Sequence, residues 1–166
     1  MRAKYYKAVE AAAGWMAGAE TATVQDRALQ LLGLAWAGGD KAAMRKAAAG
    51  LRRDQRPDGG WAQIPTLASD AYATGQALTA LVESGAADLD DPAYRRGIRF
   101  LMDSQVEDGS WHVATRAMPL QPYFESGFPY GHDQWISAAA TNWATMALIP
   151  AARRQPESVD RLSRKN

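Results

Sequence analysis

Three carboxylates are the side chains in this sequence best suited to acid–base chemistry. Asp70 and Asp133 each come directly before a long apolar stretch, and Glu125 lies in the segment that leads to Asp133. Carboxylate pairs cleave glycans, and His132 or Tyr130 is the candidate base beside them. An aspartate before an apolar helix is also a good N-cap, because its side chain accepts a backbone N–H of the first turn. We therefore expect Asp70 and Asp133 to be caps, and retain Asp70, Asp133, Glu125 and His132 as catalytic candidates.

Few residues in the sequence could support metal or thiol chemistry. The chain has no cysteine and two histidines, His112 and His132. This composition excludes disulfides, thiolate metal ligands and a cysteine nucleophile. We expect neither a metal site nor a cofactor.

The overall composition is that of a globular domain. The chain has 166 residues, of which 47% are hydrophobic and 22% charged, and its net charge is +1. These values are typical of soluble domains and do not indicate nucleic-acid binding. No apolar run reaches the roughly 18 residues of a membrane-spanning helix, and residues 1–5 lack the pattern of a signal peptide. We expect one domain over residues 1–152 and a polar C-terminal tail over residues 153–166.

A repeat of about fifty residues organises the chain. Segments 53–61 and 103–111 match without a gap, with their glutamines and their tryptophans each 50 positions apart. The matching residues are Gln55, Asp58, Gly59 and Trp61 in the first copy and Gln105, Asp108, Gly109 and Trp111 in the second. Asp-Gly favours a turn, and a tryptophan can pack over that turn with its indole N–H at a carbonyl. Because glutamine is a poor acid–base group, we predict a structural role for this motif.

Stretches 2–17, 40–54 and 93–105 carry charged residues on one face. This pattern predicts amphipathic helices in an outer layer, with one face toward solvent. In the first stretch we expect Tyr6 and Val9 to lie on the apolar, packed face.

Three other stretches have no charged residue: those between Arg27 and Asp40, between Asp70 and Glu83, and between Asp133 and Arg153. Helices without a charged face are buried on all sides, so these stretches predict an inner layer. The alternation of the two kinds predicts an all-α fold of three helical hairpins, an incomplete arc of an α/α toroid.

Residues 97–111 resemble the QW repeat of the prenyltransferase/squalene-oxidase-repeat superfamily, and residues 53–61 resemble a second copy. That superfamily includes squalene–hopene cyclases, oxidosqualene cyclases and protein prenyltransferase β-subunits. The resemblance covers about residues 40–149. It implies helices arranged around a central, largely apolar cavity, and it does not single out one reaction.

One activity in that superfamily depends on an aspartate of a D-x-D-D motif, which protonates a polyene. This chain contains Asp88-Leu89-Asp90-Asp91. In the family the motif opens an inner helix, whereas here it precedes Pro92 and a stretch of the outer kind. We therefore expect Asp91 to be an N-cap with Pro92 at the first helical position.

The protein prenyltransferases hold Zn²⁺ with Asp, Cys and His. By resemblance Asp70 takes the position of the aspartate ligand, but Tyr72 stands where the cysteine would be. Since a catalytic zinc site needs three protein ligands, we do not expect that activity.

One connection between repeat elements is unusually long. Trp61 and Asp70 lie 9 positions apart, whereas Trp111 and Asp133 lie 22 apart, so the second copy has 13 additional residues. Such a loop is commonly functional or covers an interface. If it belongs to a ligand site, we expect the walls among its neighbouring aromatic residues: Tyr72, Phe124, Phe128, Tyr130, Trp135 and Trp143. The alternative is that the loop covers the open end of the arc.

These features favour a repeat domain without identifiable catalytic machinery that binds an apolar small molecule or a partner. Three hairpins do not close a toroid, and an exposed apolar inner face indicates a partner. We expect this to be a second copy or an upstream domain of a longer protein. The first alternative is a terpene-cyclase-like isomerase or a fragment of one, and the second is a toroid-type polysaccharide-active enzyme.

Overall fold

The described part of the domain contains six α-helices. The computed structural model describes residues 1–116, 118 and 122–154. Within those residues all regular elements are helices. They are α1 (Arg2–Gly18), α2 (Val24–Trp36), α3 (Lys41–Asp54), α4 (Ala71–Glu83), α5 (Pro92–Ser104) and α6 (Gln134–Arg153), with a 3-10 turn, η1 (Gly131–Asp133), directly before α6. The predicted all-α fold is confirmed.

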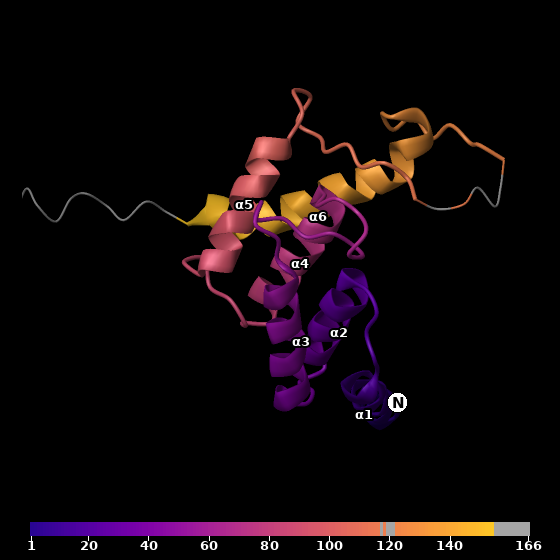
Figure 1. The fold of residues 1–166 in the computed structure, drawn as a ribbon. Coiled ribbons are helices and arrows are strands. Elements are labelled where there is room, and N and C mark those ends of the chain that lie inside the picture. The colour runs from indigo at the N-terminus through magenta and orange to yellow at the C-terminus, as the bar shows by residue number, and fades with distance from the viewer. Residues whose placement is uncertain (117, 119–121, 155–166) are drawn as a thin grey trace, which may run out of the picture.

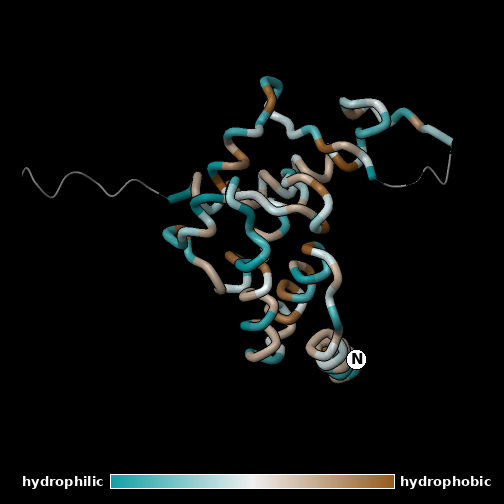
Figure 2. Tube along the Cα trace, in the orientation of Figure 1, coloured by the Kyte–Doolittle hydropathy of each residue, from teal (hydrophilic) through white to brown (hydrophobic). Residues whose placement is uncertain are grey.

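Helices α2, α4 and α6 form the inner layer, and α4 lies in the middle of the molecule (Figure 1). It packs against α2 on one side and α6 on the other. The outer helix α3 packs mainly against α2, and α5 packs mainly against α4, the inner helix of the preceding hairpin. Hydrophilic residues recur along both outer helices (Figure 2). The core between the layers is built from fully buried aliphatic side chains: Leu31, Leu32, Leu34, Leu51, Leu78, Leu81 and Leu101.

Side-chain caps start the helices where the sequence places short polar residues. Asp70 accepts a hydrogen bond from the Ala73 N–H at 2.8 Å, and Asp91 accepts one from the Ala93 N–H at the same distance. Pro92 follows Asp91 at the first helical position. Both capping predictions are confirmed, which fixes the starts of α4 and α5.

The two copies of the repeated turn have nearly the same geometry. Trp61 is fully buried, and its indole N–H donates to the Leu51 carbonyl at 2.7 Å; Trp111 donates to Leu101 at 2.8 Å. Gly59 and Gly109 have φ of 87° and 86°, a region that favours glycine. The turn therefore ties each tryptophan to the last turns of the preceding outer helix.

The aspartate and the glutamine of each copy close the turn. Asp58 accepts from the Gly60 N–H and Asp108 from the Ser110 N–H, both at 2.9 Å. The Gln55 and Gln105 amides donate to the carbonyls of residues 59 and 109 at 2.9 and 2.8 Å. These contacts support the structural role expected for all eight residues.

The two inner helices α4 and α6 do not align in the way that matching Asp133 with Asp70 would suggest. The Trp61 N–H donates to the Thr74 hydroxyl, and the Trp111 N–H donates to the Thr141 hydroxyl. Thr74 lies four residues after Asp70, whereas Thr141 lies eight after Asp133. Helix α6 therefore begins one turn earlier than α4, and Asp133 is not the counterpart of Asp70.

The inner layer is packed more tightly in its middle than at its ends. Helix α4 is buried from Ala71 to Leu81 except at Tyr72, as expected of an inner helix. Helices α2 and α6, however, expose large apolar side chains, including Trp36, Trp135 and Met146. The expectation of burial on all sides is wrong for these two helices, because each has an inner neighbour on one side only.

Helix α1 is largely exposed. Among its residues only Ala13 is buried, and Tyr6 and Val9 are 59% and 46% exposed. The expected apolar face of α1 is therefore wrong, since the helix contacts the domain mainly through its last turns, at Met16 and Ala17.

The C-terminal helix also runs farther than expected. Pro150 lies inside α6, which continues to Arg153, and the Arg154 guanidinium binds both carboxylate oxygens of Asp90 at 2.8 and 2.9 Å. Residues 153 and 154 thus belong to the domain. The rest of the expected tail, residues 155–166, lies outside the described part.

Candidate functional site

A groove of about 580 Å³ opens on the inner layer, close to the N-terminal ends of α2, α4 and α6. Its apolar wall consists of Tyr72 from α4 and Trp135, Ile136 and Ala139 from α6. Its polar wall consists of Gln25, Gln63, Thr115, Arg116 and His132. The groove thus brings together three of the predicted residues: Tyr72, Trp135 and His132.

A hydrogen-bonded cluster fixes one side of the groove. The Tyr72 hydroxyl donates to the Gln25 side-chain oxygen at 2.8 Å, and the Gln63 amide donates to the same oxygen at 3.2 Å. The Gln63 carbonyl accepts from the Val24 N–H at 3.1 Å. These contacts join α2, α4 and the segment after the first repeated turn, so this wall is set by three parts of the chain.

The cation that faces the groove is neutralised within the protein. Arg116 forms a hydrogen-bonded ion pair with Asp70, and both side chains are mostly buried. Asp70 also caps α4, so its two oxygens are used by the helix and by the arginine. The pair leaves no net charge at this wall, which suits a neutral ligand.

Asp133 anchors the long loop. Its oxygens contact the Thr115 N–H and the His112 ring nitrogen Nε2, both at 2.7 Å, and no side-chain hydrogen bond caps α6. The hydrogen bond from Thr115, followed by the contact with His112, lowers the pKa of Asp133 below its ordinary value. Its expected capping role is wrong, because α6 begins through η1 and the carboxylate turns back to the loop.

Glu125 is exposed and accepts hydrogen bonds from the Tyr123 hydroxyl and from the Gly127 N–H. The hydrogen bond from Tyr123 and that from Gly127 lower the pKa of Glu125. None of Asp70, Asp133 and Glu125 lines the groove, and each has its own partners. The structure does not bring these carboxylates together in one cleft.

The aromatic candidates separate into three groups. Trp135 is 55% exposed in the groove and meets the edge of Phe128, with ring centroids 6.0 Å apart. Tyr130 contacts the Ser110 hydroxyl instead, and Phe124 is exposed. Trp143 is partly buried and packs where α6 crosses α4. Of these residues only Trp135 lines the groove, where Tyr72 is the other aromatic candidate, and Phe128 contacts Trp135 without lining the groove.

The D-x-D-D-like segment lies on the outer side. Asp91 caps α5 and binds Arg52, and Asp90 binds Arg95 and Arg154. The hydrogen bond from Arg154, above all, lowers the pKa of Asp90. This segment is a helix start held by arginines, as expected for the cap.

Four polar residues of the groove escaped the sequence analysis: Gln25, Gln63, Thr115 and Arg116. They come from three separate parts of the chain and follow no motif. The charge of Arg116 within an otherwise apolar and aromatic segment was the one local signal for it.

Neither a cluster of metal-ligating side chains nor a membrane-spanning helix is present in the described residues. Among residues 1–116, 118 and 122–154, no group of three or more His, Asp or Glu side chains is arranged to hold a metal ion. In the same residues, no helix is both long and apolar enough to span a bilayer.

Comparisons with known proteins show which family the chain resembles. The profile of the family described as "Squalene-hopene cyclase C-terminal domain" matches residues 6–163. A lanosterol synthase of Aspergillus fumigatus is 32% identical over 111 residues, and a lanosterol synthase of Saccharomyces cerevisiae is 29% identical over 111 residues. Each match covers 67% of this chain and 14% of the synthase, so the chain corresponds to a small part of these relatives.

Proposed function

Because the chain belongs to the squalene–hopene cyclase C-terminal domain family, we propose that it is a terpene-cyclase-like domain whose groove binds a neutral, apolar small molecule. The observation that carries this proposal is the groove of about 580 Å³ between Tyr72 and the exposed face of Trp135. Ligand sites are typically concave and apolar, with a few fixed polar groups. The Gln25–Gln63 cluster and the Arg116–Asp70 pair are such groups.

We further propose that this chain supplies walls for a ligand and no proton donor of its own. Protonation of an alkene needs an acid that holds its proton in a dry site. The pKa values of Asp90, Asp91, Asp133 and Glu125 are all lowered, so these groups are ionised at neutral pH. That pattern supports a binding role over an isomerase, and the separate partners of Asp70, Asp133 and Glu125 support it over a polysaccharide-active enzyme, which needs a carboxylate pair.

Farnesol is a suitable first probe, since two relatives are named lanosterol synthases and lanosterol is an isoprenoid alcohol. Native mass spectrometry should detect the protein with bound farnesol, and tryptophan fluorescence should change on titration. Trp135→Ala should weaken binding about tenfold or more, because a buried aromatic contact contributes about 1.5–3 kcal/mol.

Trp36→Ala is the matched control, because Trp36 is an exposed tryptophan of an inner helix that does not line the groove. It should bind farnesol like the unchanged protein. Equal weakening by both substitutions, or no adduct at all, would count against the groove as the binding site.

A second candidate function is assembly, favoured by a specific surface. Helix α1 exposes Tyr5, Tyr6 and Trp15, and α6 exposes Met146 and Ile149. Exposed apolar side chains grouped on two helices at opposite ends of the helix array indicate partner contacts. We propose that a second copy or another domain covers at least one of them.

A further inference from the structure

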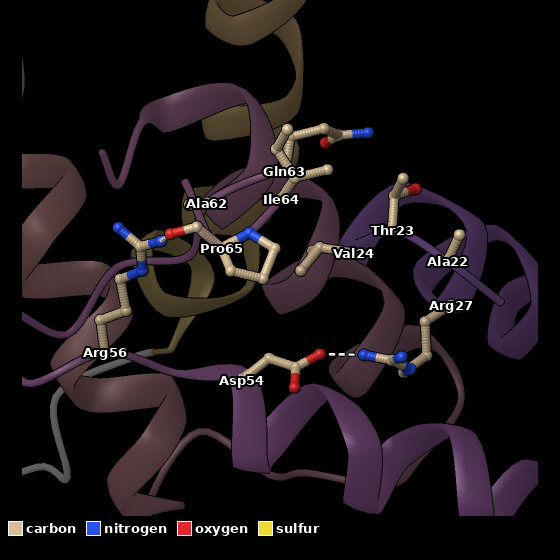
Figure 3. A pocket seen from close by; sticks show the side chains of 10 residues that line it. All are labelled: Ala22, Thr23, Val24, Arg27, Asp54, Arg56, Ala62, Gln63, Ile64 and Pro65. Atoms are coloured by element: carbon tan, nitrogen blue, oxygen red, sulfur yellow. Dashed lines mark hydrogen bonds and ion pairs between the residues drawn. The ribbon is translucent and has the colours of Figure 1, made fainter. Parts of the chain in front are cut away.

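Two cavities other than the groove share the side chain of Arg27. Each has a volume of about 320 Å³. The first lies between the start of α2 and the segment 62–65, and Figure 3 shows Arg27 and Asp54 in its lining, joined by their ion pair. The second lies between the α1–α2 connection and α3, and its charged lining residues are Glu20, Arg27, Lys46 and Arg53.

Arg27 is held in place by α3. Its guanidinium pairs with Asp54, and its side chain is 17% exposed. It lies directly over Gly50, where an added Cβ would come within 2.6 Å of Arg27 Cδ. The glycine therefore provides the space for an arginine to lie against the helix, so the position of this cation is fixed before any ligand binds.

Basic residues outnumber acidic ones in the lining of the second cavity. Lys46, Gly50 and Arg53 follow one another at intervals of four and three residues, so they share one face of α3. Burial lowers the pKa of Arg27, and the neighbouring charge of Arg53 lowers it further, which indicates that the two guanidiniums repel each other. Asp54 pairs with Arg27, whereas Lys46 and Arg53 form no ion pair with any residue in the described part of the chain.

The acidic residue of the second cavity does not remove this excess. Glu20 lines the cavity, is exposed, and has no ion pair within the described residues. The second cavity is thus lined by three cations and the carboxylate of Glu20, whereas Asp26 and Asp54 act on Arg27 from outside its lining. A ligand with negative charge would relieve the repulsion between Arg27 and Arg53 and would be opposed by Glu20.

We infer that the second cavity is a binding site for a compact oxyanion of the phosphate type, held by Lys46 and Arg53 with Arg27 as its fixed wall. Arginine binds phosphate through paired N–H donors, and lysine adds a point charge. A volume of about 320 Å³ holds a phosphate or a phosphate monoester with a small substituent. The phosphate could come from a soluble compound or from a lipid headgroup, since both present the same group.

The test measures inorganic phosphate binding by NMR titration of backbone amides at constant ionic strength, with chloride as the reference anion. Shifts should concentrate at residues of the second cavity. Arg53→Ala should weaken phosphate binding about fivefold, the effect of one charge pair near the surface. Glu20→Gln should tighten it by a similar factor, because it removes the opposing charge.

Arg99→Ala is the matched control, an exposed arginine of the outer helix α5 that lines neither cavity. It should leave phosphate binding unchanged. Equal weakening in Arg99→Ala and Arg53→Ala would overturn the site in favour of general attraction by the basic surface, and so would phosphate shifts no larger than those with chloride.

Vesicles distinguish the two sources of phosphate. The protein could cosediment with phosphatidic acid vesicles but not with phosphatidylcholine vesicles. If Arg53→Ala abolishes that binding, the result supports the site and identifies a lipid headgroup as the ligand. Binding of inorganic phosphate without vesicle binding would support it with a soluble phosphate as ligand.

Discussion

Asp91 has two structural tasks at the start of α5, since it accepts from the Ala93 N–H and binds Arg52. Asp91→Ala should lower the free energy of unfolding by about 1 kcal/mol, the usual value of an N-cap. Urea unfolding followed by circular dichroism measures this change.

Asp90→Ala is the comparison, because Asp90 belongs to the same D-x-D-D-like segment but caps no helix. Its loss should destabilise the domain less than the loss of Asp91. A larger effect for Asp90 than for Asp91 would mean that the ion pair with Arg154 outweighs the cap.

The anchor of the long loop should depend on pH. The pKa of Asp133 is lowered from its ordinary 3.8 by the hydrogen bond from Thr115 and by the contact with His112. A lowered carboxyl pKa stabilises the folded state above the ordinary value, and this stabilisation is lost as pH falls through the folded-state pKa. The Thr115 amide should therefore lose protection from hydrogen exchange only below about pH 4.

Asp133→Asn provides the control for that experiment. It should give low protection of the Thr115 amide at all pH values, because an amide oxygen accepts a weaker hydrogen bond than a carboxylate. Unchanged protection in this variant would contradict the anchoring role.

Single residues were predictable where their partners are close in sequence. Asp70 and Asp91 cap helices that start at the next residue, so the local pattern sufficed. The Arg116–Asp70 pair and the Tyr72–Gln25 hydrogen bond join residues 46 and 47 positions apart, respectively, and no local pattern encodes them.

At the level of elements, the two copies of the repeated turn differ in one respect. The Gln55 amide donates to Ala93 of the next outer helix in addition to Gly59, and its oxygen accepts from Arg96. Gln105 reaches only Gly109 among the described residues. The first turn thus joins two hairpins, whereas the second closes only on itself.

Gln55→Ala should therefore destabilise the domain by about 1–3 kcal/mol, because it removes three hydrogen bonds, one of them to a charged group. Gln105→Ala should cost about 0.5–1.5 kcal/mol, the value of one hydrogen bond. Thermal or urea unfolding of both variants would measure the difference, and equal losses would contradict a joining role for Gln55.

The close crossing of α4 and α6 depends on the absence of a side chain at Gly75. A Cβ at Gly75 would lie 2.6 Å from the carbonyl carbon of Trp143 and 2.7 Å from the Ala144 nitrogen. These are backbone atoms, so the helices would have to separate. Gly75→Ala should destabilise the domain by about 1–3 kcal/mol, the usual cost of overpacking, although alanine is the better helix former.

Gly14→Ala in α1 is the matched control, since a Cβ at Gly14 would have no neighbour within 4 Å. It should stabilise the domain by up to about 1 kcal/mol through helix propensity. The same unfolding assay serves both variants, and stabilisation by Gly75→Ala would exclude a close crossing.

Elements were predictable in kind but less so in register. Charge patterns separated inner from outer helices, and this division holds for the packing of α2 to α6. The extra turn of α6 was hidden because Asp133 resembles Asp70 as a cap. The apolar pattern of α1 gave a wrong prediction, since no other part of the described residues covers the face that carries Tyr6 and Val9.

At the level of the whole molecule, the apolar residues of α1 and α6 predict self-association of the purified chain. Trp15 is 74% exposed on α1, and Ile149 is 37% exposed on α6. Since charged residues are strongly disfavoured in the centre of an interface, Trp15→Glu and Ile149→Glu should each shift the protein toward monomer in sedimentation velocity over a micromolar concentration series. Arg99→Glu, an exposed change on α5, should not. If the protein without substitutions stays monomeric throughout the series, assembly through these helices is contradicted. Ligand binding in the groove would then remain as the proposed role.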